Sequence, residues 1–112
     1  MTTPPLELLK GTLDVLILKT VGGGPVHGYG VSRSIREATR EEFRVEEGAL
    51  YPALRRLEKK GFLTSGWGET DTGRQAKFYE LTPAGRAELE ASLGTWHRYV
   101  AAMGRVLDAP TG

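Results

Sequence analysis

The chain has 112 residues, enough for one small domain with a single core and too few for a deep internal pocket. It contains no cysteine, which excludes disulfide frameworks and cysteine-based zinc sites. Its formal net charge of +1 argues against a non-specific polyanion binder, so a nucleic-acid surface would have to come from local clusters of basic residues.

The first predicted element is a helix over residues 6–21, preceded by residues 1–5, which we expect to be disordered. Apolar residues fall on more than one face of this helix, so it should be buried on more than one side, and a partner subunit could provide the second cover. A Gly-Gly-Gly-Pro segment at residues 22–25 ends the helix. No apolar run has the form of a signal peptide or a membrane span, so we expect a cytoplasmic protein without membrane contact.

A second helix is predicted over residues 26–40, and a turn region at residues 39–46 leads out of it. In that turn, Phe43 and Val45 are expected to point inward. Three residues of the helix are expected to face the core: Val31, Ile35 and Ala38.

Residues 50–61 form the pattern that bears most directly on function, a helix with one apolar and one basic face. The apolar residues recur at three- and four-residue spacing, and burying them directs the basic residues outward. Taken alone, this pattern also fits an ordinary solvated surface helix. The apolar face consists of Leu50, Ala53, Leu54 and Leu57, and the opposite face carries Tyr51, Pro52, Arg55, Arg56 and Lys59.

Pro52 constrains where this third helix begins, because a proline within a helix removes one hydrogen bond and crowds the carbonyl four residues back. We therefore expect the helix to start near Glu46 or Glu47, with Gly48 allowing close approach of the backbone, and to stop at Gly61.

A β-hairpin is predicted next, with strands over residues 62–69 and 76–81 joined by a turn-rich segment. Arg74 and Lys77 lie beside its tip and are candidates for phosphate contacts, although a merely solvated hairpin would look the same. Trp67 and Tyr79 are expected to belong to the core.

The last predicted helix spans residues 83–107, with Thr82 as its cap and Pro83 at its first position. Its apolar residues alternate spacings of four and three, which is a heptad seam and favours a dimerisation helix. The alternative is that it folds back along the first helix of its own chain. Residues 108–112 are expected to be a disordered tail. The seam consists of Leu89, Leu93, Trp96, Val100, Met103 and Leu107.

Together these elements predict a mainly α fold with a small β-hairpin. Residues 6–82 would form a winged helix-turn-helix DNA-binding domain, and residues 83–107 a C-terminal dimerisation helix. In such a fold the third helix docks in the major groove, and the hairpin, or wing, reaches phosphate or the minor groove.

Motifs along nearly the whole chain also resemble the PadR family of bacterial transcriptional regulators, in a short, stand-alone form. Two positions depart from the family pattern: Gly30, where an acidic or larger residue is frequent, and Gln75, where a second basic residue is common. The motifs are Leu9-Lys10-Gly11-Thr12-Leu13-Asp14, Gly24-Pro25 with His27-Gly28-Tyr29, Gly48-Ala49-Leu50-Tyr51-Pro52-Ala53-Leu54, Trp67-Gly68, Gly73-Arg74-Gln75-Ala76-Lys77-Phe78-Tyr79 and Leu81-Thr82-Pro83-Ala84-Gly85.

The resemblance implies a homodimeric repressor that binds double-stranded DNA at an inverted-repeat operator and is released by a small molecule or another signal. Arginine suits bidentate contacts to guanine, and lysine suits phosphate. Tyr51 could offer its hydroxyl to a phosphate or pack against the second helix. The candidate DNA contacts are Gly48, Tyr51, Arg55, Arg56, Lys59, Arg74 and Lys77, with Ser32, Arg33 and Lys10 as weaker candidates.

Trp96 is the one candidate ligand residue. At the middle of the seam, two symmetry-related indoles could form a slot for a planar aromatic effector, or simply fill the dimer interface. No cofactor or metal is expected.

An enzyme is disfavoured because His27 and His97 are isolated and no phosphate-binding glycine loop, metalloprotease motif or nucleophile elbow is present. His27 and Tyr29 are interpreted as capping and packing residues. The alternative to DNA binding is a winged-helix module for protein interaction or ligand sequestration, which would not need three basic residues on one helix face.

Overall fold

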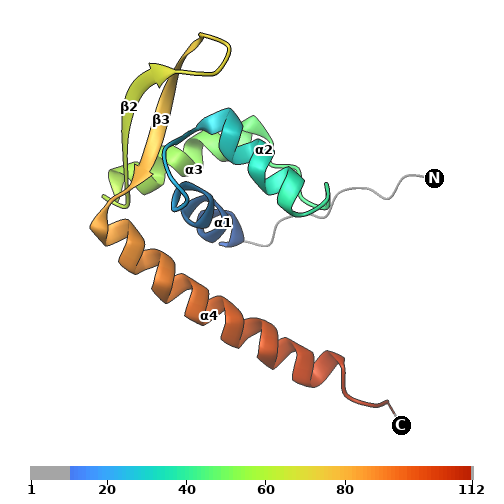
Figure 1. Cartoon of the computed structure of the whole chain (residues 1–112). Coiled ribbons are helices and arrows are strands. Elements are labelled where there is room, and N and C mark those ends of the chain that lie inside the picture. The colour runs from blue at the N-terminus through green and yellow to red at the C-terminus, as the bar shows by residue number, and fades with distance from the viewer. Residues whose placement is uncertain (1–10, 112) are drawn as a thin grey trace, which may run out of the picture.

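The computed structural model describes residues 11–111 and contains four helices and three strands in that range (Figure 1). None of these helices is long and apolar enough to cross a membrane. In chain order the elements are α1 (Thr12–Val21), β1 (Val26–His27), α2 (Gly28–Ala38), α3 (Glu47–Lys59), β2 (Leu63–Glu69), β3 (Gln75–Leu81) and α4 (Pro83–Leu107).

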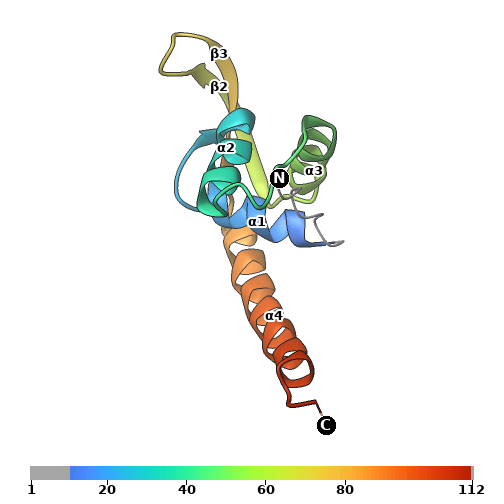
Figure 2. The same ribbon diagram turned by 90° about the vertical axis from the view of Figure 1, so that its right-hand side faces the viewer.

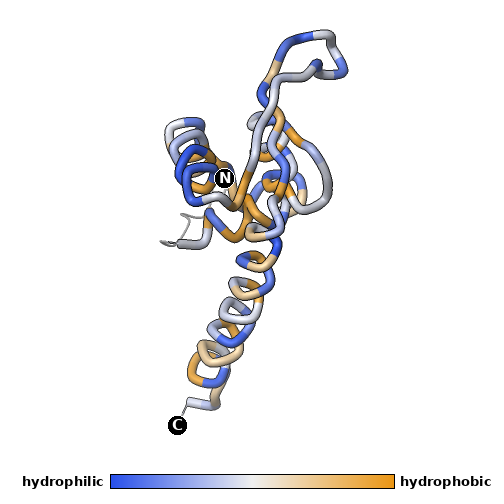
Figure 3. The backbone as a smooth tube through the Cα atoms, turned by 90° about the vertical axis from the view of Figure 1, so that its left-hand side faces the viewer, coloured by the Kyte–Doolittle hydropathy of each residue, from blue (hydrophilic) through white to orange (hydrophobic). Residues whose placement is uncertain are grey.

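The core lies where α1, α2 and α3 meet the base of the hairpin, and Figure 3 shows their hydrophobic stretches converging there. The inward positions predicted for α3 are confirmed, and so are Val31, Ile35 and Val45. Ala38 was predicted to be inward and is exposed, because it ends α2 where the chain turns away from the core. The buried residues are Ile17, Leu18, Val21, Val31, Ile35, Val45, Leu50, Ala53, Leu54, Leu57, Leu63, Tyr79 and Leu89.

The helix boundaries follow local chemistry. Gly11, with φ of 89°, precedes α1, which starts at Thr12. The part of this helix predicted over residues 6–10, including Lys10, lies outside the described residues. Glu46 precedes the first residue of α3, as Pro52 led us to expect. Gly61, with φ of 84°, ends α3 in the left-handed conformation that glycine adopts readily.

The sheet has three strands in the order β1-β3-β2, so the predicted hairpin is present and a third strand joins it. Val26 pairs with Tyr79 and His27 with Phe78. The second helix was predicted to begin at residue 26, which is wrong. His27 Nδ1 instead accepts a hydrogen bond of 2.9 Å from the Gly30 amide and caps α2, so its predicted capping role is confirmed.

The last helix, α4, begins as expected: the Thr82 hydroxyl accepts a hydrogen bond of 2.9 Å from the Gly85 amide, and Pro83 is its first residue. Its first half packs along α1. Its second half extends away from all the other elements, as both Figure 1 and Figure 2 show. Residues 108–111 after it have no regular secondary structure.

Candidate nucleic-acid interface

The basic face of α3 is open. Arg55 and Lys59, one turn apart, are both exposed and make no hydrogen bond or ion pair within residues 11–111. They are held outward because Leu54 and Leu57 anchor the opposite side of the helix in the core. No atom lies within 4 Å of the place where a Cβ on Gly48 would stand, so the backbone at the start of α3 is open to a close approach.

Arg56 lies on the flank of α3 and faces a different neighbour. One of its terminal nitrogens is 2.6 Å from Asp14 Oδ1 on α1, with the arginine half-exposed. Its guanidinium is therefore directed toward α1, and the three basic residues predicted for one face divide into an open pair and a residue that braces two helices.

Tyr51 packs against the first residue of α2. A Cβ on Gly28 would stand only 2.7 Å from Tyr51 Cε1 and 3.1 Å from its hydroxyl oxygen, so the glycine leaves the space that the ring uses. Of the two interpretations of Tyr51, packing against the second helix describes its observed contacts. The ring also borders a shallow pocket of about 240 Å³ shared with Lys77 of β3.

Glu58 on the last turn of α3 links this helix to the hairpin. Its Oε2 accepts a hydrogen bond of 2.6 Å from the Ser65 hydroxyl, and its Oε1 lies 3.8 Å from Lys77 Nζ. Burial, followed by the nearby Glu58 carboxylate, raises the pKa of Tyr79 above its ordinary value of 10.0. Lys77 is thus directed toward α3, whereas the exposed Arg74 lies at the turn between the strands.

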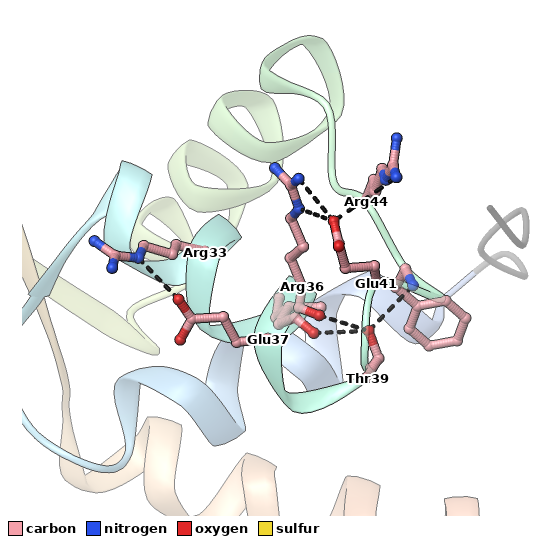
Figure 4. Close-up of polar contacts among 8 residues, drawn as sticks. Arg33, Arg36, Glu37, Thr39, Glu41 and Arg44 are labelled. Carbon is pink, nitrogen blue, oxygen red and sulfur yellow. Dashed lines mark hydrogen bonds and ion pairs between the residues drawn. The ribbon is translucent and has the colours of Figure 1, made fainter.

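The α2 candidates have partners of their own. The Ser32 hydroxyl donates a hydrogen bond of 3.2 Å to the Val45 carbonyl, which ties α2 to the residues before α3. Arg33 pairs with Glu37 at 2.9 Å in an exposed ion pair, and this hydrogen bond raises the pKa of Arg33 (Figure 4).

The turn between α2 and α3 holds a charge cluster that we did not predict. Glu41 lies 2.7 Å from Arg36 and 3.7 Å from Arg44, and the hydrogen bond from Arg36 lowers the pKa of Glu41 (Figure 4). Arg40 and Glu41 both have positive φ, 50° and 66°. The spacing of these residues does not predict two consecutive left-handed backbone positions. The charge cluster that forms at this turn is therefore visible only in the structure.

The hairpin presents one large aromatic side chain to solvent. Trp67 was predicted to lie in the core and is 75% exposed, because it belongs to the half of β2 nearer the tip of the hairpin, which extends past the helices (Figure 2). Tyr79, also predicted to be in the core, is buried. Tyr29 is 65% exposed, and its ring stacks on the neighbouring His27 with centroids 6.3 Å apart, which agrees with the local packing predicted for it.

The heptad seam of α4 divides in two. Leu89 is buried and Leu93 packs against the core of the same chain, so this half follows α1. The remaining apolar residues of the second half are exposed, and Val106, which the seam did not include, joins them at 76% exposure. The exposed residues are Tyr99, Val100, Met103, Val106 and Leu107.

Trp96 lies at the boundary of these halves, half-buried, with its ring stacked on Tyr99 at a centroid distance of 5.9 Å. Both rings line a groove of about 520 Å³ between α1 and α4, which Asp14 and Lys60 also border. Tyr99 was missed because it falls outside the heptad positions.

The order of the elements, in which α3 follows a turn after α2 and precedes a hairpin, defines a winged helix-turn-helix protein. Residues 17–91 match the Transcriptional regulator PadR-like family, and the chain belongs to that family. The resemblance seen in the motifs is therefore confirmed, and the chain is a transcriptional regulator of this family.

Relatives and solved structures with regulator names agree with this assignment. The chain is 39% identical over 83 residues to "Transcriptional regulator Rv3488" of Mycobacterium tuberculosis, covering 74% of each chain. It is 29% identical over 77 residues to "Negative transcriptional regulator PadR" of Bacillus subtilis, covering 69% of this chain and 42% of that protein. A transcriptional regulator from Clostridium thermocellum is similar in structure, with a TM-score of 0.79 and 30% identity over 88% of this chain and 95% of the other.

A PadR family regulator from Clostridium difficile R20291 gives a TM-score of 0.75 at 31% identity, covering 87% of this chain and 99% of that one. The matched share is larger than residues 1–82 alone could supply, so the agreement reaches into α4 as well as the winged helix.

Proposed function

We propose that the protein is a homodimeric repressor that binds double-stranded DNA at an inverted-repeat operator. The observation that carries this proposal is the open face of α3, where Arg55 and Lys59 are exposed and make no hydrogen bond or ion pair with the described residues. The helix is anchored by a buried leucine face, so it can enter a major groove without unfolding any part of the core.

Within this proposal the candidate residues take different roles. Arg55 reads base edges, since its guanidinium is free to make a bidentate contact with guanine, and Lys59 binds phosphate. Gly48 lets the start of α3 approach the backbone closely. Arg56 holds α3 on α1 through Asp14 rather than entering the groove.

The remaining contacts are to phosphate. Arg74 at the wing turn reaches the backbone, and Lys77 exchanges its distant partner Glu58 for phosphate when DNA is bound. Tyr51 places its hydroxyl beside the start of α2, and Ser32 and Arg33 lie on that helix. Lys10 keeps its proposed phosphate contact but lies outside the described residues.

The dimer forms through α4. Its second half exposes apolar residues that would remain in water in a monomer, and a twofold pairing of the seam would bury them. A twofold dimer presents two copies of α3, which must be about 34 Å apart to meet successive major grooves. The relation between the two copies of α4 therefore sets whether the dimer fits DNA.

Repression is supported by the Bacillus subtilis relative, which is named a negative transcriptional regulator. We propose that the regulator is released from its operator when a small planar aromatic effector binds at Trp96. There the stacked Trp96 and Tyr99 rings border the groove between α1 and α4. An occupant there would change the packing of α4 and shift the population toward dimers that do not fit DNA. We place this function in the cytoplasm, and it requires no catalysis.

Fluorescence anisotropy with a labelled duplex from the region upstream of the gene tests the proposal. Binding is measured at several salt concentrations against a scrambled duplex of the same length. A DNA binder loses affinity linearly in log salt, and a specific one prefers the upstream duplex. A protein that binds neither duplex at low salt would be an interaction or sequestration module instead.

A further inference from the structure

We propose that Trp67 is a DNA-contacting residue of the wing, defined as β2, β3 and the turn between them, and that its indole lies on the sugar-phosphate backbone beside the groove occupied by α3. This inference rests on the proposed function, because it supposes that α3 meets DNA. It adds an apolar contact to a surface so far described by charge alone.

Strand pairing fixes the side of the hairpin on which Trp67 lies. Trp67 is opposite Lys77 and Ser65 is opposite Tyr79, and side chains directly opposite one another in an antiparallel pair share a face. Ser65 and Lys77 both contact Glu58 of α3. Trp67 therefore lies on the α3 side of the hairpin, two residues closer to the tip than Ser65.

The neighbours of Trp67 explain why nothing covers it. The other face of the hairpin carries Gly66 and Gly68, and a Cβ on Gly68 would stand 2.9 Å from the Phe78 ring, which occupies that face. Among residues 11–111, the α3 side has no such cover beyond Glu58, and Figure 2 shows the hairpin extending past the helices toward its tip. A 75% exposed indole on this side is thus placed next to whatever α3 binds.

The chemistry of this position favours the backbone of DNA over a base edge. An indole offers an apolar face that packs against deoxyribose and an N–H that donates to phosphate oxygen, and it accepts no hydrogen bond. A hairpin beside a helix in the major groove meets the bordering backbone first.

Nearby charges are compatible with phosphate. Arg74 is exposed at the turn, and Lys77 is directly opposite Trp67. Of the carboxylates on this face, Glu58 is occupied by Ser65 and Lys77, and Glu69 lies over the turn, 4.0 Å from where a Cβ on Gly73 would stand.

The test combines affinity with tryptophan emission, using the full chain, a duplex from the region upstream of the gene and a scrambled duplex. The emission change of Trp67 is the difference between wild type and Trp67→Phe, which retains Trp96. Trp67→Ala is compared with Thr64→Ala, an exposed residue of β2 whose side chain lies on the other face. Thermal unfolding of each variant confirms that the fold is retained.

We expect DNA to quench wild-type emission and to leave the emission of Trp67→Phe nearly unchanged. Trp67→Ala should weaken binding to both duplexes by about tenfold. Its salt dependence should equal that of wild type because no ionic contact is lost, whereas Lys77→Ala should reduce the salt slope by about one. Thr64→Ala should bind as wild type does.

Three results would overturn the inference. Trp67→Ala could bind as tightly as wild type, the quenching could persist in Trp67→Phe, or Trp67 emission could respond to protein concentration without DNA, which would assign it to a contact between copies. In these cases wild type still binds DNA and the proposed function stands. If wild type binds neither duplex, both proposals fail together.

Discussion

Arg56 of α3 and Asp14 of α1 lie 42 positions apart in the sequence and form an ion pair of 2.6 Å between the two helices. Asp14 also borders the groove beside α4, so the pair connects the helix proposed to read DNA with the side of the molecule proposed to dimerise. Arg55, the next residue along α3, has no such partner in the described residues. Two adjacent arginines are thus placed for different tasks.

This division predicts that Arg56 contributes to folding rather than to sequence reading. Because the pair is partly exposed, we expect a coupling free energy of about 0.5 kcal/mol between Asp14→Asn and Arg56→Gln in a double-mutant cycle of urea unfolding. If the coupling were zero and Arg56→Gln lost its preference for the operator, Arg56 would instead be a DNA contact in the major groove.

Arg55→Ala should behave in the opposite way. We expect operator affinity to fall by about 1–3 kcal/mol and the preference for the operator over a scrambled duplex to relax, with unfolding in urea unchanged. Arg86→Ala removes the same charge from an exposed site on α4 and serves as the control. Equal losses in both variants would mean that only net charge matters and that α3 is misassigned.

Much of the fold could be predicted because the local spacing of apolar residues indicates each helix and strand. The leucine spacing of α3 and the alternation in the hairpin each repeat often enough to show which side is buried. The two-residue strand β1 has no period to detect, and it exists because Val26 and His27 meet the edge of β3. Its discovery required the tertiary structure.

The candidate site was less predictable, because the periodicity of a sequence shows which face of a helix or strand a residue lies on but not which residues pack against that face. Arg56 shares the basic side of α3 in sequence, yet its partner comes from α1. Trp67 alternates like a core residue, but the alternation does not show that the outer half of the hairpin extends past the helices and leaves it exposed. The heptad seam continues through Leu93 and Val100 without indicating that the same chain covers the first and leaves the second exposed.

Gly85, in the first turn of α4 after the hairpin, should tolerate no side chain. A Cβ there would overlap the Phe62 carbonyl oxygen, so Gly85→Ala should destabilise the protein by about 1–3 kcal/mol. Gly94 lies on the same helix with no atom within 4 Å of an added Cβ. Gly94→Ala should therefore stabilise the protein by about 0.5–1 kcal/mol, because alanine has the higher helix propensity. If urea unfolding showed Gly85→Ala to be the more stable of the two variants, the close packing of Gly85 against Phe62 would be refuted.

Tyr79 should make stability fall at alkaline pH. Its pKa is raised by burial, so the folded protein keeps the phenol proton where the unfolded chain, near its ordinary value of 10.0, loses it. The stabilisation is complete below about pH 10 and is lost as the pH rises from there through the folded pKa. Tyr79→Phe should have a flatter stability profile above pH 10, whereas Tyr29→Phe, at an exposed site, should match wild type.

The exposed half of α4 predicts a dimer that can be broken without unfolding the monomer. Met103 is 43% exposed and outside the core cluster, so Met103→Asp should fold but leave an unpaired charge in the proposed twofold seam. We expect monomers by light scattering and loss of operator binding, because a monomer engages only one half-site. Ala101→Asp places the same charge on the opposite side of α4 and should remain dimeric; a Met103→Asp dimer as stable as wild type would show that the seam is not the interface.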